Sequence, residues 1–177
     1  EYLFSHMSRA VLNADENLIE KLKKIIVYIK RKNRDIILTG VNKPKFVCSS
    51  DAAYKRISYE SRLGYMFHLV EEDEKIEDIK IYENIIKWKS KLNKTLVDST
   101  TSAECLAAKL ALKHVHKYID ICKQLWGDDI QYVHMIDNLP LLKCLEKEKF
   151  EEEPRMNGCI KYNVQNLKDL KGKVVWV

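Results

Sequence analysis

A chain of 177 residues with 46% hydrophobic and 32% charged side chains is long enough for one globular domain with an appendage, and this composition excludes fibrous and disordered classes. No apolar run reaches the length of a membrane span, and the N-terminus lacks the layout of a signal peptide, so neither membrane insertion nor secretion is predicted. The net charge of +5 suits a nucleic-acid partner but is too small to indicate one by itself.

The first predicted element is a helix over residues 13–32. Its apolar side chains recur at helical spacing and form one stripe: Leu18, Leu22, Ile25, Ile26 and Ile29. We expect this stripe to pack against the rest of the protein. The opposite, lysine-rich face is interpreted as solvated, and a surface that follows nucleic-acid phosphates is the functional alternative.

Short strands are predicted next, over residues 36–39, 46–50, 62–70 and 85–89. Trp88 in the last of these is expected to anchor the core, as is Tyr65. Residues 71–78 carry six carboxylates between two of the strands. We interpret this acidic segment as a solubilising hairpin tip, because it lacks the glycine turns of a cation-binding loop.

A second long helix is predicted over residues 101–126, where small and apolar residues keep helical spacing and Gly127 follows. His114 and His116 lie in mid-helix, far from the acids in sequence, and are interpreted as core-edge or surface residues. The remaining elements alternate between strand and helix: a strand at 131–136, helices at 139–145 and 159–170, and a strand at 173–177. This order predicts an α/β fold whose mixed five-stranded sheet has three antiparallel strands first and parallel strands after them, flanked by helices and preceded by an extra N-terminal helix.

The five cysteines are scattered and form no CxxC pair. Cysteines of odd number and irregular spacing are typical of reduced, buried thiols rather than of a disulfide framework or a zinc site. We therefore predict free thiols and an intracellular protein.

Three acids follow or begin predicted elements: Asp51 after a strand, Glu104 in the first turn of the second long helix, and Asp137 after a strand. Each acid alone has a structural explanation, because Asp is common after strands and Glu in first helical turns. Together they can converge on one or two divalent cations, as in metal-dependent cleavage of phosphodiesters.

The motifs around these acids, in this order, resemble the ribonuclease H domain at the C-terminal end of the polyprotein of copia-type LTR retrotransposons. The stretch from Tyr2 to Arg9, followed by Val27-Tyr28-Ile29-Lys30, is similar to the family's "LSR … RYLK" connection. Ser50-Asp51-Ala52-Ala53-Tyr54 and then Ser61-Arg62-Leu63-Gly64-Tyr65 are similar to "SDAS/W … S-x-x-G-Y". Trp88-Lys89-Ser90-Lys91 resembles "W-x-S-K", Ser99 to Glu104 resembles "SSTEAE" with Ser102 in place of Glu, and Asp137-Asn138 resembles "DN".

The resemblance implies a ribonuclease H-like fold and a nuclease that cuts the RNA strand of RNA–DNA hybrids during reverse transcription. It implies two Mg²⁺ ions (or Mn²⁺), with Asp51 bridging both, Glu104 holding one ion and orienting the ribose 2′-OH, and Asp137 holding the other. Residues 1–44 would be a connection segment from the reverse transcriptase, and residues 45–177 the ribonuclease H-like domain with an acidic insertion at 70–83. The partners would be the hybrid and the polymerase domain of the same polyprotein, in the cytoplasm, a virus-like particle or the nucleus. Basic residues near the first acid and the third strand are the candidate nucleic-acid contacts: Lys55, Arg56, Arg62, Lys89, Lys91 and Lys94.

One feature of that family is missing. Its fourth carboxylate opens a helix beyond the last strand, whereas this sequence ends with the strand at 173–177, and Asp169 would lie at the opposite end of the sheet from the other acids. Three alternatives therefore remain open: an active nuclease, a catalytically inactive ribonuclease H-like remnant or domesticated module that binds nucleic acid or protein, and a plain α/β domain whose acids are only structural.

Overall fold

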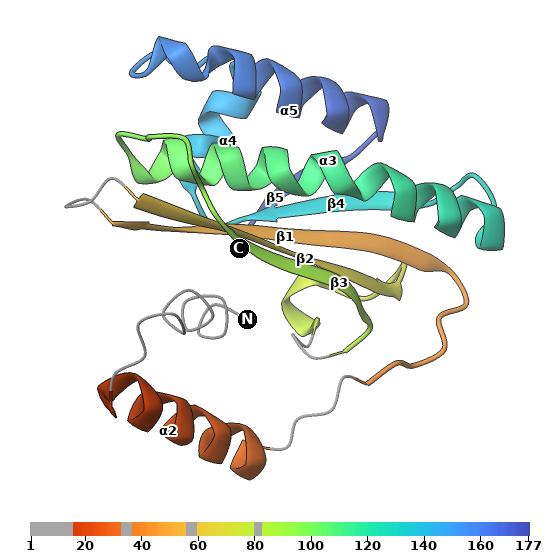
Figure 1. The fold of residues 1–177 in the computed structure, drawn as a ribbon. Helices are drawn as coiled ribbons and strands as arrows, with labels where there is room; N and C mark the ends of the chain where they lie inside the picture. Colours follow the sequence, from red (N-terminus) through yellow and green to blue (C-terminus); the bar gives the residue numbers. More distant parts are fainter. Residues whose placement is uncertain (1–15, 33–36, 56–59, 80–82) are drawn as a thin grey trace.

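The computed structural model describes residues 16–32, 37–55, 60–79 and 83–177. A twisted five-stranded sheet has long helices layered over one of its faces (Figure 1). The strands are β1 (Pro44–Lys55), β2 (Glu60–Glu71), β3 (Ile85–Leu92), β4 (Gln131–Ile136) and β5 (Lys173–Trp176). The helices are α2 (Glu16–Lys32), α3 (Thr100–Trp126), α4 (Leu139–Glu146) and α5 (Asn157–Asp169), with short 3-10 turns η2 (Ile76–Asp78) and η3 (Pro154–Met156).

The sheet has the strand order β3-β2-β1-β4-β5. Strands β1, β2 and β3 pair antiparallel, while β4 pairs parallel with β1, and β5 parallel with β4. The predicted α/β fold, with three antiparallel strands followed by parallel ones, is therefore confirmed. Because β1 and β4 run parallel in the centre of the sheet, the residues that follow their paired segments meet at one edge.

The main core lies between the sheet and α3. Phe46 and Phe67 from the sheet are fully buried there, and burying a side chain of that size contributes about 2–3 kcal/mol. Alanines on α3, such as Ala107 and Ala111, are also fully buried, and their small side chains let the helix approach the strands closely. The position of α3 on the sheet is therefore fixed by the packing of its whole inner face.

The ends of α3 are set by their own sequence. The Ser99 side chain accepts a hydrogen bond from the Ser102 backbone N–H at 3.1 Å, which caps the first turn. Gly127 ends the helix with a φ of 93°, a conformation that costs glycine little and other residues more. The helix predicted over 101–126 is confirmed with almost the same bounds.

Two predictions about packing need correction. Leu22 and Ile26 of the predicted stripe on α2 are 37% and 41% exposed, because an amphipathic pattern shows only which face can be buried; the side chains of Leu18, Ile25 and Ile29 lie outside the described residues. Trp88 is 45% exposed, because it lies on the edge strand β3 and points to the sheet face opposite α3, whereas the next residue, Lys89, reaches His114 of α3. Tyr65 is buried as predicted.

Two shorter predictions are revised. The strand predicted over 36–39 is represented by a single bridge between Ile37 and Glu83, and residue 36 lies outside the described residues. The acidic segment 71–78 is more than a polar tip. The Glu71 carboxylate accepts hydrogen bonds from the backbone N–H groups of Asn42 and Lys43, and Ile76 packs on an apolar cluster at the open face of the sheet.

All five cysteines are free, as predicted; four of them are buried, and Cys144 is half-buried. Among the helices of the described residues, none combines the length and the apolar character that crossing a bilayer requires.

Candidate metal centre

Asp51 projects from the central strand of the sheet. The parallel pairing of β1 with β4 ends at Ser49 and Met135, but β1 continues to Lys55 alongside β2. Asp51 therefore lies within β1 and not after it, which corrects the shorter strand predicted over 46–50. The reason is that β2 still supplies hydrogen bonds to β1 after β4 has ended.

Asp137 directly follows β4, as predicted. It lies two residues beyond Met135, just as Asp51 lies two residues beyond Ser49, so the parallel register sets the two acids side by side. On its other side the chain is fixed by Asn138, whose side chain accepts a hydrogen bond from the Leu141 N–H at 2.8 Å and caps α4. Asp137 is held between a buried strand and a capped helix.

Glu104 reaches the same place from α3. The helix begins at Thr100, so Glu104 opens its second turn and not the first as predicted. Its Oε1 accepts a hydrogen bond from the backbone N–H of Ala52 at 3.0 Å. That N–H is available because β4 no longer pairs with β1 at this point. The contact fixes the Glu104 carboxylate against the strand that carries Asp51.

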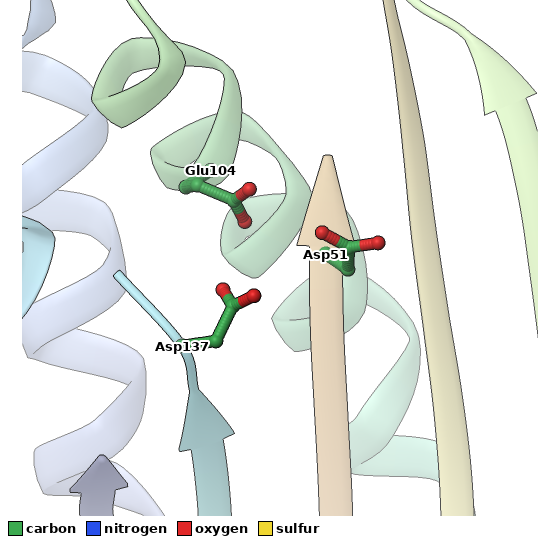
Figure 2. Close-up of side chains that lie close together, drawn as sticks. All are labelled: Asp51, Glu104 and Asp137. Atoms are coloured by element: carbon green, nitrogen blue, oxygen red, sulfur yellow. The ribbon is translucent and has the colours of Figure 1, made fainter. Parts of the chain in front are cut away.

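The three acids form one cluster. An oxygen of each carboxylate lies within 4.8 Å of an oxygen of each of the others, and within the described part of the chain this is the one such grouping of possible metal ligands. Figure 2 shows Glu104 from the helix, Asp51 from the strand and Asp137 from the turn after β4 gathered around a common space. Asp51 and Asp137 are exposed, and Glu104 is only 6% exposed.

The electrostatics of the cluster are unfavourable without a cation. Burial, together with the charges of Asp51 and Asp137, raises the pKa of Glu104 from 4.5 to about 8, although the hydrogen bond from Ala52 acts in the opposite direction. The Glu104 Oε2 atom is buried and has no hydrogen-bond partner in the described structure. A buried, unpaired acceptor is costly, and a bound cation would supply its missing partner. The cluster could therefore hold a metal ion.

Asp169 does not join this cluster. It ends α5 and precedes β5, which runs parallel to β4, so it lies at the opposite end of the sheet from Asp137. Its carboxylate accepts a hydrogen bond from Gln165 in the last turn of α5. The expected location of Asp169 is thus confirmed.

The predicted nucleic-acid contacts fall into different settings. Arg62 on β2 is only 8% exposed, Lys89 is half-buried, and Lys91 and Lys94 are exposed. Lys55 ends β1, and Arg56 lies outside the described residues. Their binding of nucleic acid stays a prediction.

Sequence reasoning missed a positively charged surface beside α3. Lys89 Nζ lies 3.5 Å from the Nε2 atom of His114. Burial, followed by the charges of Lys89, Lys117, Lys87 and Lys113, lowers the pKa of His114. The spacing of lysines on β3 and α3 was visible in the sequence, but only the pairing of the elements shows that they surround one histidine.

The backbone N–H of Ala52, which orients Glu104, was also missed, because no residue type signals a backbone donor.

Ser102 stands where the resembling family has Glu. It is fully buried, and its hydroxyl donates a hydrogen bond to the Glu153 carboxylate on the segment before α5. This contact helps to hold the start of α3, and with it Glu104, in place.

Solved structures with a similar fold are ribonuclease H domains. Ribonuclease H1 of the halophilic archaeon Halobacterium salinarum matches with a TM-score of 0.50 and 15% identity, over 75% of this chain and 85% of that chain. The LC11 ribonuclease H1 in complex with an RNA/DNA hybrid matches with a TM-score of 0.52 and 11% identity, over 75% and 85%. The N-terminal ribonuclease H domain of a Mycobacterium tuberculosis protein, solved as a fusion with maltose-binding protein, matches with a TM-score of 0.52 and 11% identity, over 76% and 83%.

Neither the protein-family models nor the curated proteins give a match to this sequence. At 11–15% identity the structural likeness establishes the fold alone. The chain has a ribonuclease H-like fold. The carboxylates of Asp51, Glu104 and Asp137 gather beside the sheet, where its central parallel pairing of β1 with β4 ends.

Proposed function

We propose that this chain is a ribonuclease H domain that cleaves the RNA strand of RNA–DNA hybrids during reverse transcription of a copia-type retrotransposon. The observation that carries the proposal is the meeting of Asp51, Glu104 and Asp137 within 4.8 Å on a ribonuclease H-like sheet. The motifs that surround these acids in the sequence support the copia context. The hybrid bound to one of the similar structures supports the substrate.

The residues present fit divalent cations. Carboxylate oxygens are the ligands that Mg²⁺ and Mn²⁺ prefer, and the unpaired Oε2 of buried Glu104 offers one directly. Asp51, Glu104 and Asp137 would hold the ions of the proposal. When bound, such ions activate a water molecule and stabilise the leaving oxygen of the phosphodiester.

The protein's own contribution is to orient these ligands. The Ala52 N–H fixes Glu104, the Asn138 cap fixes the turn that carries Asp137, and the β1–β2 pairing fixes Asp51. Ligands held on strands and a packed helix need little rearrangement to accept a charged substrate. Glu104, the member of the cluster that α3 supplies, is the residue that we assign to orienting the ribose 2′-OH, the group that distinguishes RNA from DNA.

Grip on the hybrid would come from positive charge. Exposed Lys91 and Lys94 and half-buried Lys89 lie on and after β3, two strands from Asp51. Lysines gain affinity for nucleic acid by neutralising phosphates, whatever the base sequence. Residues 1–44 would connect the domain to the polymerase part of the same polyprotein, which would share in binding the hybrid.

The experiment is a cleavage assay on an RNA–DNA hybrid labelled on the RNA strand, in Mg²⁺ and in Mn²⁺. Asp51→Asn should abolish cleavage, because it removes the central charged ligand, and it should leave the circular dichroism spectrum and melting temperature almost unchanged. Asp169→Asn is the matched control, because this acid lies at the far end of the sheet, and it should cleave like the unaltered chain.

An unaltered chain that binds hybrid but does not cut it in Mn²⁺ would instead be a non-catalytic binding module of the same fold. An Asp51→Asn variant that cuts at the original rate would refute the proposed site.

A further inference from the structure

Two cysteines from different helices lie in direct contact. The Sγ atoms of Cys105 on α3 and Cys159 on α5 are 3.0 Å apart. Both residues are buried, with 0% and 6% exposure, and both are free thiols. A disulfide bond is about 2.05 Å long, so the two sulfurs need to approach by only about 1 Å to form one.

This thiol pair (Cys105 and Cys159) lies in the main hydrophobic core, where the buried polar side chain of Asn163 contacts it. The Cys105 thiol donates to the sulfur of Cys159. The side-chain amide of Asn163 donates to the carbonyl oxygen of Cys105 at 3.0 Å and lies 3.5 Å from its sulfur. Asn163 is itself fully buried, and its Oδ1 has no hydrogen-bond partner in the part of the chain that the structure describes. The hydrogen bonds of the Asn163 amide nitrogen therefore go to the thiol pair and to the backbone of Cys105.

The surroundings of Cys159 favour its thiolate form. The hydrogen bond from Cys105, together with the charges of Lys109 and Lys113, lowers the pKa of Cys159, although its burial acts in the opposite direction. Because the thiolate is the nucleophilic form, we assign the first attack to Cys159 and the closing of the bond to Cys105, whose sulfur lies 3.0 Å away.

We propose that Cys105 and Cys159 form an oxidisable dithiol that hydrogen peroxide converts into an intramolecular disulfide joining α3 to α5. The Cys159 thiolate attacks the peroxide, takes up one oxygen as a sulfenic acid and releases hydroxide. The Cys105 thiol then attacks the Cys159 sulfur, the S–S bond forms, and water leaves. In total, two thiols lose two electrons and two protons, and one peroxide is reduced to two waters.

The position of this bond connects it to the carboxylate cluster. Cys105 is the neighbour of Glu104 on α3, and it is 54 positions before Cys159, so the closed loop contains β4 and Asp137. Cross-linking a loop of this length restricts the unfolded chain and stabilises the folded one. Oxidation would thus hold together the segments that supply two of the three carboxylates. The thiol chemistry itself is independent of the proposed nuclease activity.

The test treats the purified chain with hydrogen peroxide and maps its cysteines by mass spectrometry after digestion without reduction. The expected result is a cross-linked pair of peptides containing Cys105 and Cys159, lighter than the separate peptides by two hydrogens. The melting temperature should rise by roughly 10 °C on oxidation and return to its original value with dithiothreitol.

Cys159→Ser removes the attacking sulfur and should abolish both the cross-link and the rise in melting temperature. Cys122→Ser is the matched control: it replaces another buried cysteine of α3 but leaves the thiol pair intact, so it should keep both effects. The proposal is wrong if Cys105 and Cys159 stay free while half-buried Cys144 is oxidised, or if they link to other cysteines. These readouts do not involve cleavage, so their failure is distinct from failure of the nuclease assay.

Discussion

Two polar clusters lie next to each other at β1 and β4, and they differ in how the hydrogen bonds of their buried members are satisfied. In the first, which we term the histidine cluster (Ser50, Tyr132 and His134), the imidazole Nε2 lies 2.9 Å from the Ser50 hydroxyl and Nδ1 lies 2.9 Å from the Tyr132 hydroxyl. In the second, the carboxylate cluster, Glu104 has one oxygen bound to Ala52 N–H and the other unpaired.

The difference separates a structural use of buried polarity from a functional one. Burial lowers the pKa of His134 to about 4, so the ring is neutral at physiological pH, and both its nitrogens have partners inside the protein. Nothing remains for a ligand to add. Glu104 instead has a raised pKa, acidic neighbours and a free acceptor, so its site is completed only by a cation or a proton.

The largest effect should come from breaking the histidine cluster. His134→Ala leaves a cavity in a fully packed strand and removes the partners of the Ser50 and Tyr132 hydroxyls, so the free energy of unfolding should fall by about 4 kcal/mol. Urea unfolding followed by circular dichroism measures this. His116→Ala, at a half-buried histidine bound to Asn166, is the control and should lose about 1 kcal/mol or less. A similar loss for both variants would contradict the structural role given to His134.

The next effect should come from titrating Glu104 in the metal-free protein. Its folded pKa of about 8 exceeds the unfolded value of 4.5, so the folded state binds the extra proton between these values. The free energy of unfolding should therefore decrease as pH rises from about 4.5 to about 8, by on the order of 3 kcal/mol. Urea unfolding at several pH values in EDTA measures this dependence.

Glu104→Gln removes the titrating group while keeping its size, so this variant should lose most of that pH dependence. Mg²⁺ or Mn²⁺ should raise the stability of the unaltered chain at pH 8 but have little effect on the variant, because binding requires the carboxylate. If the variant keeps the full pH dependence, the titration belongs to another residue.

The smallest effect should come from trimming one member of the histidine cluster. Ser50→Ala leaves the Nε2 of His134 with only the distant sulfur of Cys48 at 3.9 Å, so the free energy of unfolding should fall by about 1–2 kcal/mol. Ser49→Ala, on the half-buried opposite face of β1, should change stability by less than about 0.5 kcal/mol. Equal effects at both positions would show that the hydroxyl contact to His134 contributes nothing.

The sequence alone determined most of the fold and the identity of the candidate ligands. Alternating or continuous apolar runs predicted the strands, and helical spacing of small residues followed by Gly127 predicted α3. These patterns are local: they reflect the repeat of the strand or helix backbone and the positive φ of Gly127 at the end of α3. Asp51, Glu104 and Asp137 were identified from their places relative to these elements and from the surrounding motifs.

The tertiary structure decided what each residue faces. Trp88 is half-exposed, and Leu22 and Ile26 of α2 are exposed, since exposure depends on which element pairs with which and not on residue type. Tertiary structure also decided several side-chain contacts. The Ala52 N–H donates to Glu104, the hydroxyl groups of Ser50 and Tyr132 hydrogen-bond with the His134 imidazole, and Cys105 contacts Cys159. These contacts follow from the register of β1 with β4 and from the packing of α5 on α3, which no local pattern in the sequence specifies.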